Sequence, residues 1–431
     1  RSTIVAAMEE LVACDVLESD FGGGTRVKSN TWSLLASRPP DWNRYIESGP
    51  FKANLETIRT INKLEFEPGY IRIGTGELSP SLYPSKLVNK ILKKLPSRMT
   101  SLNYLGPLGL PELRQVLAER LYAEQNIQCT PGNILIVSGS LQGLQLISVC
   151  MLKKGSMVYT EAPTYLKSLQ VFQSAGMGLM GVPMDQEGLK YWEIKDRSDK
   201  GLIYTIPTNQ NPTGNVMSRQ RRLNLLNFCQ KERLPIIEDD AYGQLWIDEK
   251  PPEAIKAQDR NGTVIYMGTV SKTMAPGLRT GWGVGPESVV YRLGDVKMQT
   301  DYGASSISQW IFAEFLSSGL YDEYIVQLRG ILRERRDRAL DVLERHYRAL
   351  AVWNVPNGGF YIWLTLKNAA ATEKLFESAA MAGILLNPGD MYDFARNGSL
   401  RLSYAYTTPD EFERAAIRLA RIIRSETDSW H

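Results

Sequence analysis

The stretch that decides the fold is GLIYTIPTNQNPTGNVMSRQRRLNLLNFCQKERLPIIEDDAY, residues 201–242. It opens with a largely apolar run over 201–206, continues with a helical pattern over 219–233, and returns to an apolar run over 234–237. A further short apolar run follows at 264–267. Strand–helix–strand alternation is typical of a largely parallel sheet with helices on both faces. We therefore expect an α/β fold.

Polar side chains follow each of these three predicted strands. Asn211 lies in the loop NPTG after the first strand, Asp239 at the end of the second, and Lys272 after the third. Ligands of parallel sheets bind beyond the carboxyl ends of the strands, and these residues lie there. Asp240, next to Asp239, is the competing carboxylate.

Lys272 stands among groups that a pyridoxal phosphate site requires. In TVSKTMAPGLR, the lysine follows Thr269 and Ser271 and precedes Arg279 by seven residues (279 − 272 = 7). A Schiff-base lysine must spend time as a neutral amine, and a nearby cation helps to lower its pKa. The hydroxyls and the arginine could bind the phosphate, and Asp239 could keep the pyridine nitrogen protonated.

Other residues could complete such a site. Asn211 and Tyr242 could donate hydrogen bonds to the phenolate oxygen, and Tyr165, in EAPTY, could stack on the ring. The loop VSGSLQG joins an apolar strand to a helix, and a helix N-terminus favours an anion such as phosphate. Its donors would be the Ser140 side chain and the backbone amides of Leu141 and Gln142.

Arg401 lies far downstream in SLRLS, an alternating pattern that predicts a strand. An arginine in such a strand is usually a solvated face residue. If it points into the site instead, its planar fork suits an α-carboxylate. Arg401 is therefore the candidate for binding a substrate or effector.

Composition limits the classes of function. With 431 residues, 43% hydrophobic and 23% charged, the chain is expected to be a soluble globular protein of two or three domains. Its net charge of +3 gives no general signal for polyanions. With only two histidines, a histidine-ligated metal site or a serine–histidine hydrolase is not expected. The four cysteines are scattered without a CxxC motif and are expected to be buried reduced thiols. No apolar segment predicts a membrane span or signal peptide, so we expect a cytoplasmic protein.

The first 28 residues show a separate pattern. A helix is predicted from Ser2 and Thr3, which could cap it, to about Ala13, and a short hairpin around FGGG at 21–24. So short a piece cannot hold a core unaided. Residues 29–40 end in two prolines and are predicted to be a linker.

A basic stretch lies further along, where five arginines occur within residues 329–338. Such a cluster most often forms a solvated helix face. The alternative is a track for DNA phosphates.

From residue 41 to the C-terminus, about nine-tenths of the chain, the sequence resembles class I/II, fold-type I pyridoxal-phosphate aminotransferases. The motifs that carry the resemblance occur in family order: SGSLQG, EAPTY, NPTG, EDDAY, SKTMAPGLR and SLRLSY. It lies nearest to the branch with α-aminoadipate and kynurenine aminotransferases. It implies a large domain with a mainly parallel sheet over about 100–315, and a small α+β domain from 41–99 and 316–431.

The resemblance also implies residue roles. Lys272 would form an internal aldimine with pyridoxal 5'-phosphate, Asp239 would bind the ring nitrogen, and Arg401 the substrate carboxylate. Tyr104 resembles the tyrosine that family members lend to the partner subunit's phosphate, which implies a homodimer. Leu141 replaces a polar residue of many relatives, although its amide would still serve. The remaining cofactor contacts would be Ser140, Gln142, Tyr165, Asn211, Tyr242, Thr269, Ser271 and Arg279.

Residues 1–28 are similar to the end of a GntR-type winged helix-turn-helix, from the recognition helix through the wing. The first two helices would lie upstream of Arg1. With the linker and the aminotransferase-like domain, the chain resembles MocR-type transcriptional regulators, which implies DNA contacts through Arg1, Ser2 and Thr3. The segment holds three basic and five acidic side chains, a net of 3 − 5 = −2, so this part alone is not expected to bind DNA tightly.

Two main hypotheses about function follow. In the first, the chain is a regulator that binds pyridoxal phosphate on Lys272, senses the cofactor or an amino compound, and thereby controls DNA binding. In the second, it is a working aminotransferase for an amino acid and a 2-oxo acid, in which Lys272 moves the proton. A lyase or decarboxylase on the same fold is a third, because fold does not determine the reaction. The winged-helix resemblance favours the regulator.

Overall fold

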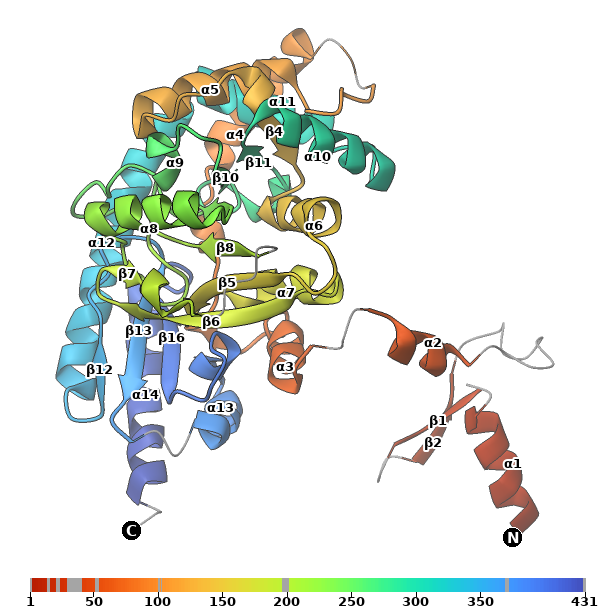
Figure 1. Ribbon diagram of the computed structural model, residues 1–431. Coiled ribbons are helices and arrows are strands. Elements are labelled where there is room, and N and C mark those ends of the chain that lie inside the picture. The colour runs from red at the N-terminus through yellow and green to blue at the C-terminus, as the bar shows by residue number, and fades with distance from the viewer. Residues whose placement is uncertain are drawn as a thin grey trace. The chain divides into compact units, whose positions relative to one another are not determined.

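The computed structural model describes residues 2–13, 16–20, 24–28, 41–50, 54–99, 101, 103–195, 201–368 and 372–428. The chain divides into two compact units, Arg1–Ala53 and Asn54–His431, each with its own contacts (Figure 1). The predicted linker over 29–40 lies outside the described residues.

The first unit contains the predicted helix and hairpin. Helix α1 (Ser2–Ala13) is followed by strands β1 (Leu17–Asp20) and β2 (Gly24–Val27), which pair antiparallel. Helix α2 (Trp42–Ser48) also belongs to this unit and has no buried side chain. The chain thus divides after Ala53, later than residue 41, where the sequence places the start of the aminotransferase-like region.

The second unit is built on an eight-stranded sheet with the order β4-β11-β10-β9-β8-β5-β6-β7. Neighbours from β10 to β6 are parallel, β11 is antiparallel to both β10 and β4, and β7 is antiparallel to β6. This confirms the predicted α/β fold. The strands are β4 (Ile134–Val137), β5 (Met157–Ala162), β6 (Gly178–Asp185), β7 (Gly188–Leu189), β8 (Leu202–Thr205), β9 (Ile236–Asp239), β10 (Val264–Thr269) and β11 (Gly281–Val284).

Alternate residues of the central strands serve two different cores. Ile203, Ile236 and Val264 pack with helices α8 and α9. The residues that follow them in the chain pack with α6, α7 and α10. This period of two is what a sheet covered by helices on both faces requires. These helices are α6 (Ser140–Met151), α7 (Leu166–Ser174), α8 (Arg219–Glu232), α9 (Ile255–Gln258) and α10 (Glu287–Thr300).

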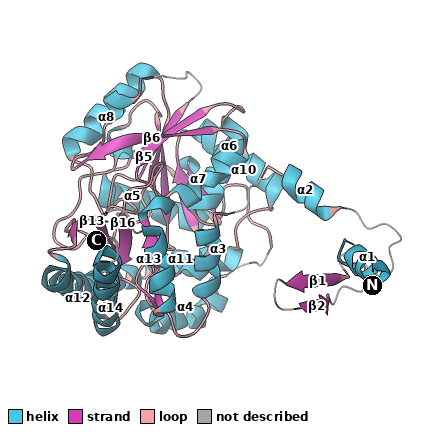
Figure 2. Cartoon of the chain, turned by 90° about the horizontal axis from the view of Figure 1, so that it is seen from below, coloured by secondary structure: helices cyan, strands magenta, loops and turns pink. Residues whose placement is uncertain are grey.

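A smaller antiparallel sheet has the order β12-β13-β16-β15, and β3 pairs with β14 in a separate two-stranded sheet. Their strands are β3 (Ile71–Arg72), β12 (Ala351–Trp353), β13 (Tyr361–Leu366), β14 (Ile384–Leu385), β15 (Asn387–Pro388) and β16 (Ser399–Ser403). The remaining α-helices are α3 (Glu56–Leu64), α4 (Ser85–Arg98), α5 (Pro111–Gln125), α11 (Ser306–Ser317), α12 (Leu320–Tyr347), α13 (Thr372–Met381) and α14 (Pro409–Asp428). Helices α12 and α14 lie side by side (Figures 1 and 2). In the described part of the chain, no helix has both the length and the apolar character to cross a membrane.

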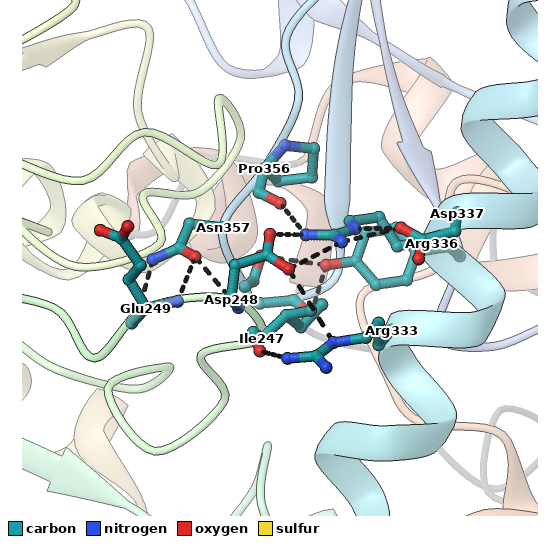
Figure 3. A network of polar contacts seen from close by, with 11 residues as sticks. Ile247, Asp248, Glu249, Arg333, Arg336, Asp337, Pro356 and Asn357 are labelled. Carbon is teal, nitrogen blue, oxygen red and sulfur yellow. Dashed lines mark hydrogen bonds and ion pairs between the residues drawn. The ribbon is translucent and has the colours of Figure 1, made fainter.

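The solvated face and the DNA track predicted for the basic stretch of α12 are wrong for Arg335 and Arg336, which are buried. Arg329 is partly buried, and Arg333 and Arg338 are exposed. Figure 3 shows Arg336 bridging the carboxylate of Asp248, that of Asp337, and the carbonyl oxygen of Pro356. Arg336 is only 5% exposed. Arg333 donates to the carbonyl of Ile247 in the same network.

Two further arginines of this stretch make equally specific contacts. Arg335 is buried and donates to the carbonyl oxygens of Ala405 and Thr407 at 3.0 and 2.9 Å. The guanidinium of Arg329 lies 4.0 Å from the centre of the Trp246 ring. Helix α12 is thereby joined to loops that follow β9 and β16, and the stretch serves folding.

We predict that Arg336→Ala lowers the free energy of unfolding by about 3 kcal/mol, at the lower end for a broken buried ion pair, because Asp248 stays partly hydrated. Urea unfolding of the purified chain measures this loss. Arg338→Ala is the matched control on the same helix, since its ion pair with Asp410 is exposed and is expected to be worth less than about 1 kcal/mol. Equal losses for the two variants would contradict the structural role of Arg336.

Candidate functional site

The predicted site residues gather at one edge of the large sheet. Strands β4, β5, β8, β9 and β10 point the same way, because β5, β8, β9 and β10 pair parallel and β11 is antiparallel to both β10 and β4. Their carboxyl ends therefore meet at the same edge. The residues at or after these ends include Ser140, Tyr165, Asn211, Asp239 and Lys272.

Asp239 is the buried carboxylate of this edge. Its Oδ2 accepts a hydrogen bond of 2.7 Å from the hydroxyl of Tyr204, whereas its Oδ1 has no partner among the described residues. Burial raises the pKa of Asp239 to about 6, while the hydrogen bond from Tyr204 and the charge of Lys272 lower it. A buried carboxylate oxygen without a partner fits a protonated ring nitrogen.

The competing carboxylate, Asp240, faces the other side of the strand. Its Oδ2 accepts from the hydroxyl of Tyr266 at 2.7 Å. Tyr266 packs in the core with α5 and α11, and Tyr204 in the core with α6 and α7. Because consecutive strand residues point to opposite faces, only one carboxylate can face the lysine, and the geometry favours Asp239.

A cavity of about 140 Å³ unites four predicted residues: Tyr165, Asn211, Lys272 and Arg401. The Lys272 Nζ donates to the carbonyl oxygen of Gly76 at 2.8 Å. Nη1 of Arg401 donates to Oδ1 of Asn211 at 2.9 Å, and Nη2 donates to the carbonyl oxygen of Gly74 at 2.7 Å. The two glycines belong to a segment that sequence reasoning did not assign to the site.

Arg401 is only 4% exposed, so it points inward rather than to solvent. Its guanidinium lies 4.3 Å from the ring centre of Tyr361 and 4.7 Å from that of Tyr392. Burial opposes its charge, but the surrounding tyrosines outweigh burial and raise the pKa of Arg401. Its Nε lacks a hydrogen-bond partner in the described residues, which leaves a donor for a carboxylate.

The hydroxyl of Tyr242 lies 2.7 Å from the hydroxyl of Tyr361. Both tyrosines are buried beside the Arg401 guanidinium. No sequence motif singles out Tyr361 or Tyr392, because tyrosines in apolar strands or turns are ordinary core residues. The role of Tyr242 at a cofactor oxygen stays a prediction.

The predicted phosphate contacts come together at the start of α6. Nη2 of Arg279 donates to the carbonyl oxygen of Ser138 at 2.9 Å, from a backbone with φ of 47°. A Cβ at Gly139 would lie 2.5 Å from that Nη2, so only glycine allows this approach. The hydroxyls of Thr269 and Ser271 lie 3.0 Å apart after β10. A helix N-terminus, a guanidinium and two hydroxyls form a donor set that suits a phosphate dianion.

Gln142, whose amide is a predicted phosphate donor, has a partner for this amide at the start of α6 in this structure. Its backbone amide donates to the carbonyl oxygen of Gly139 at 3.1 Å, as the first turn of α6 closes. Its side chain accepts from the Ser138 amide and donates to Asp301. These bonds engage both the amide and the side chain of Gln142. The side chain of Leu141 is 46% exposed, and its amide stays a predicted donor.

Tyr104 does not line this cavity. Tyr104 is 76% exposed, and its ring centre lies 5.2 Å from that of Tyr302. Of the predicted DNA contacts, Ser2 begins α1, Thr3 is exposed on it, and Arg1 lies outside the described residues.

Comparison with known proteins agrees with this geometry. The family model for aminotransferase class I and II matches residues 71–419. The HTH-type transcriptional regulator YisV of Bacillus subtilis (strain 168) is 47% identical over 428 residues, covering 98% of this chain and 88% of the relative. The HTH-type transcriptional regulator NorG of Staphylococcus aureus (strain N315) is 32% identical over 433 residues, which cover 98% of this chain and 96% of NorG.

Solved structures of aminotransferases share the fold. Pyrococcus horikoshii kynurenine aminotransferase, in complex with PMP, has a TM-score of 0.84 and 30% identity, covering 90% of this chain and 98% of that one. LysN, the α-aminoadipate aminotransferase of Thermus thermophilus, was solved in complex with N-(5'-phosphopyridoxyl)-L-leucine. It has a TM-score of 0.81 and 27% identity, and the match covers 90% of this chain and 99% of LysN.

The family and these complexes imply pyridoxal 5'-phosphate as the cofactor, and the donor set at the sheet edge fits it. The regulators match the chain over nearly its whole length, which includes the helix and hairpin of the first unit. The resemblance to MocR-type regulators is thereby confirmed. The chain belongs to the aminotransferase class I and II family, among the HTH-type transcriptional regulators that carry this domain.

Proposed function

We propose that this chain is a transcriptional regulator whose aminotransferase-like unit binds pyridoxal 5'-phosphate on Lys272 and senses the cofactor or an amino compound. The bound state then controls DNA binding through a complete winged helix. The observation that carries the proposal is the helix–hairpin unit ahead of the aminotransferase unit, an arrangement that HTH-type regulators match over 98% of this chain.

The residues of the cavity support a cofactor linked to Lys272. When bound, pyridoxal phosphate supplies an aldehyde and an electron-withdrawing ring. Lys272 would hold the aldehyde carbon through Nζ, which already lies in the cavity. Asp239 would hold a proton on the ring nitrogen, and Tyr204 keeps that carboxylate oriented through its 2.7 Å hydrogen bond.

Arg401 would bind the carboxylate of an amino compound. Its guanidinium is fixed by Asn211, Gly74 and two tyrosine rings, so little side-chain entropy remains to be lost on binding. An amino compound bound in that position would lie in the same cavity as Nζ of Lys272. Nζ could then take a proton from the amino compound and return it.

The second candidate function is aminotransferase activity. The observation that favours it is the set of candidate catalytic side chains, because Lys272 and Asp239 lie at the carboxyl edge of the large sheet and Arg401 lines the same cavity as Lys272. Steady turnover of amino donor and 2-oxo acid, with no DNA binding by the full-length protein, would decide for this alternative.

We also propose a homodimer in which Tyr104 contacts the phosphate of the partner subunit. The support is that Tyr104 and its neighbour Tyr302 are both exposed, with 76% and 61% of their surfaces accessible to solvent. Exposed aromatic side chains that lie together are typical of protein interfaces.

The experiment that tests the regulator compares the full-length parent protein with Lys272→Ala. The parent, loaded with pyridoxal phosphate, is expected to show a visible absorption band and a cofactor-dependent change in its affinity for promoter DNA. Lys272→Ala is expected to lose both the band and the DNA response, because the other lysine that lines the cavity, Lys167, is engaged by Asn62. Spectroscopy and electrophoretic mobility of the DNA measure the two effects.

Lys167→Ala is the control, since this lysine lies at the mouth of the cavity and is bonded to Asn62. It should keep the band and the DNA response. A parent protein that never takes up the cofactor would refute the proposal.

We predict opposite effects of Asp239→Asn on stability and on cofactor binding. The pKa of Asp239 is raised from 3.8 to about 6, so its charge costs stability increasingly as pH rises through this window. Without cofactor, the variant should be more stable than the parent above pH 6, by up to about 3 kcal/mol, and equal to it below about pH 4. Its affinity for the cofactor should fall. Thermal melts across pH and absorbance titrations measure the two effects.

Asp240→Asn is the matched control for this prediction. Burial raises the pKa of Asp240 as well, so this variant should also gain stability at neutral pH. It should keep its affinity for the cofactor. A larger loss of cofactor affinity for Asp240→Asn than for Asp239→Asn would assign the ring nitrogen to Asp240.

We predict that Tyr104→Phe weakens cofactor binding about tenfold or more, the usual effect of losing one hydrogen bond to a charged group. Tyr302→Phe changes the neighbouring exposed tyrosine and should have little effect. Sedimentation of the parent should give a dimer. A fully loaded monomer would disprove the contribution of Tyr104 in trans.

A further inference from the structure

The cavity of Lys272 and Arg401 has an acidic side that no motif predicts. Glu65, directly after α3, and Glu77 both line it. Glu77 follows Gly76, whose carbonyl oxygen accepts from Nζ of Lys272. A Cβ at Gly76 would lie 3.2 Å from Nη2 of Arg401, so the segment that carries Glu77 passes directly beside both cationic groups.

Glu65 and Lys167, which also line this cavity, already have partners. Arg72 lies 3.8 Å from the Glu65 carboxylate, and Lys167 donates to Oδ1 of Asn62 at 3.2 Å. Glu77, in contrast, makes neither a hydrogen bond nor an ion pair within the described residues, and it is exposed. The Glu77 carboxylate can therefore pair with the cationic group of a ligand, and because it is exposed, this pairing costs little desolvation.

The negative charge of Glu77 reaches into the cavity. Burial raises the pKa of Tyr165 to about 12, and the charge of Glu77 acts in the same direction. Burial likewise raises the pKa of Glu65, and Glu77 adds to this shift. A negatively charged distal group on a ligand would meet the same repulsion, whereas a cation would relieve it.

We propose that the amino compound recognised by this cavity is a diamino acid. Arg401 binds its carboxylate, and Glu77 binds the second ammonium group at the far end of its side chain. This inference rests on the proposed function, because it assumes that Arg401 receives a carboxylate beside the cofactor.

The test uses the full-length protein loaded with pyridoxal phosphate. L-ornithine and L-lysine are titrated against their neutral counterparts L-norvaline and L-norleucine, and against L-glutamate. Calorimetry gives the affinities, and the change in the visible spectrum of the bound cofactor reports occupancy independently. The diamino acids are expected to bind at least about fivefold more tightly than the neutral compounds, the effect of one partly exposed ion pair.

Glu77→Gln is expected to remove this preference, by lowering the affinity for the diamino acids at least about fivefold more than that for the neutral compounds. Glu67→Gln changes an exposed glutamate that does not line the cavity and serves as the matched control. It should keep the preference. The cofactor content of each variant verifies that it is folded.

Three results would overturn the inference. Neutral compounds could bind as tightly as diamino acids, L-glutamate could bind best, or Glu77→Gln could weaken all ligands equally. With the cofactor bound and DNA binding responsive to it, any of these results overturns this inference and leaves the proposed function standing. A protein that takes up no cofactor overturns both this inference and the proposed function.

Discussion

The buried guanidinium of Arg401 is the contact on which the site depends most. From β16 it reaches Asn211, which follows β8 of the large sheet, and Gly74, which follows β3. Segments more than a hundred residues apart in the chain are thereby held around one charge. Because a buried charge without partners is very costly, each of these segments has to keep its position for the fold to tolerate Arg401. The same hydrogen bonds that hold Arg401 in the site therefore also hold the segments of Asn211 and Gly74 together.

The sequence was sufficient to predict the position of a site residue where that residue directly follows a parallel strand. Asn211, Asp239 and Lys272 follow parallel strands, and the ends of such strands meet whatever the rest of the chain does. The α/β fold followed from the same alternation. The choice between Asp239 and Asp240 needed the resemblance to a family, since both follow the same apolar run, and the structure separates them by the face to which each points.

Sequence reasoning failed where the partner of a residue lies far away in the chain. The arginines of α12 resemble a solvated face until Asp248, Pro356 and the carbonyl of Ala405 are placed against them. Glu77 and Tyr361 belong to no motif, because their importance comes only from the folding that brings them to the cavity of Arg401. The predicted contact of the Gln142 amide with a phosphate stays a prediction, and in this structure that amide donates to the carbonyl oxygen of Gly139.

The bond between Lys272 and Gly76 has a consequence for the attachment of a cofactor. An ammonium group has three protons and can donate one to the carbonyl of Gly76, but a nitrogen engaged in a covalent link has fewer to share. Attachment of a cofactor at this nitrogen would therefore weaken its hydrogen bond to Gly76. Residues 74–77 carry Glu77 and contact Arg401 through Gly74. In the proposed function, attachment of the cofactor to Lys272 would in this way be coupled to the position of the residues that recognise the amino compound.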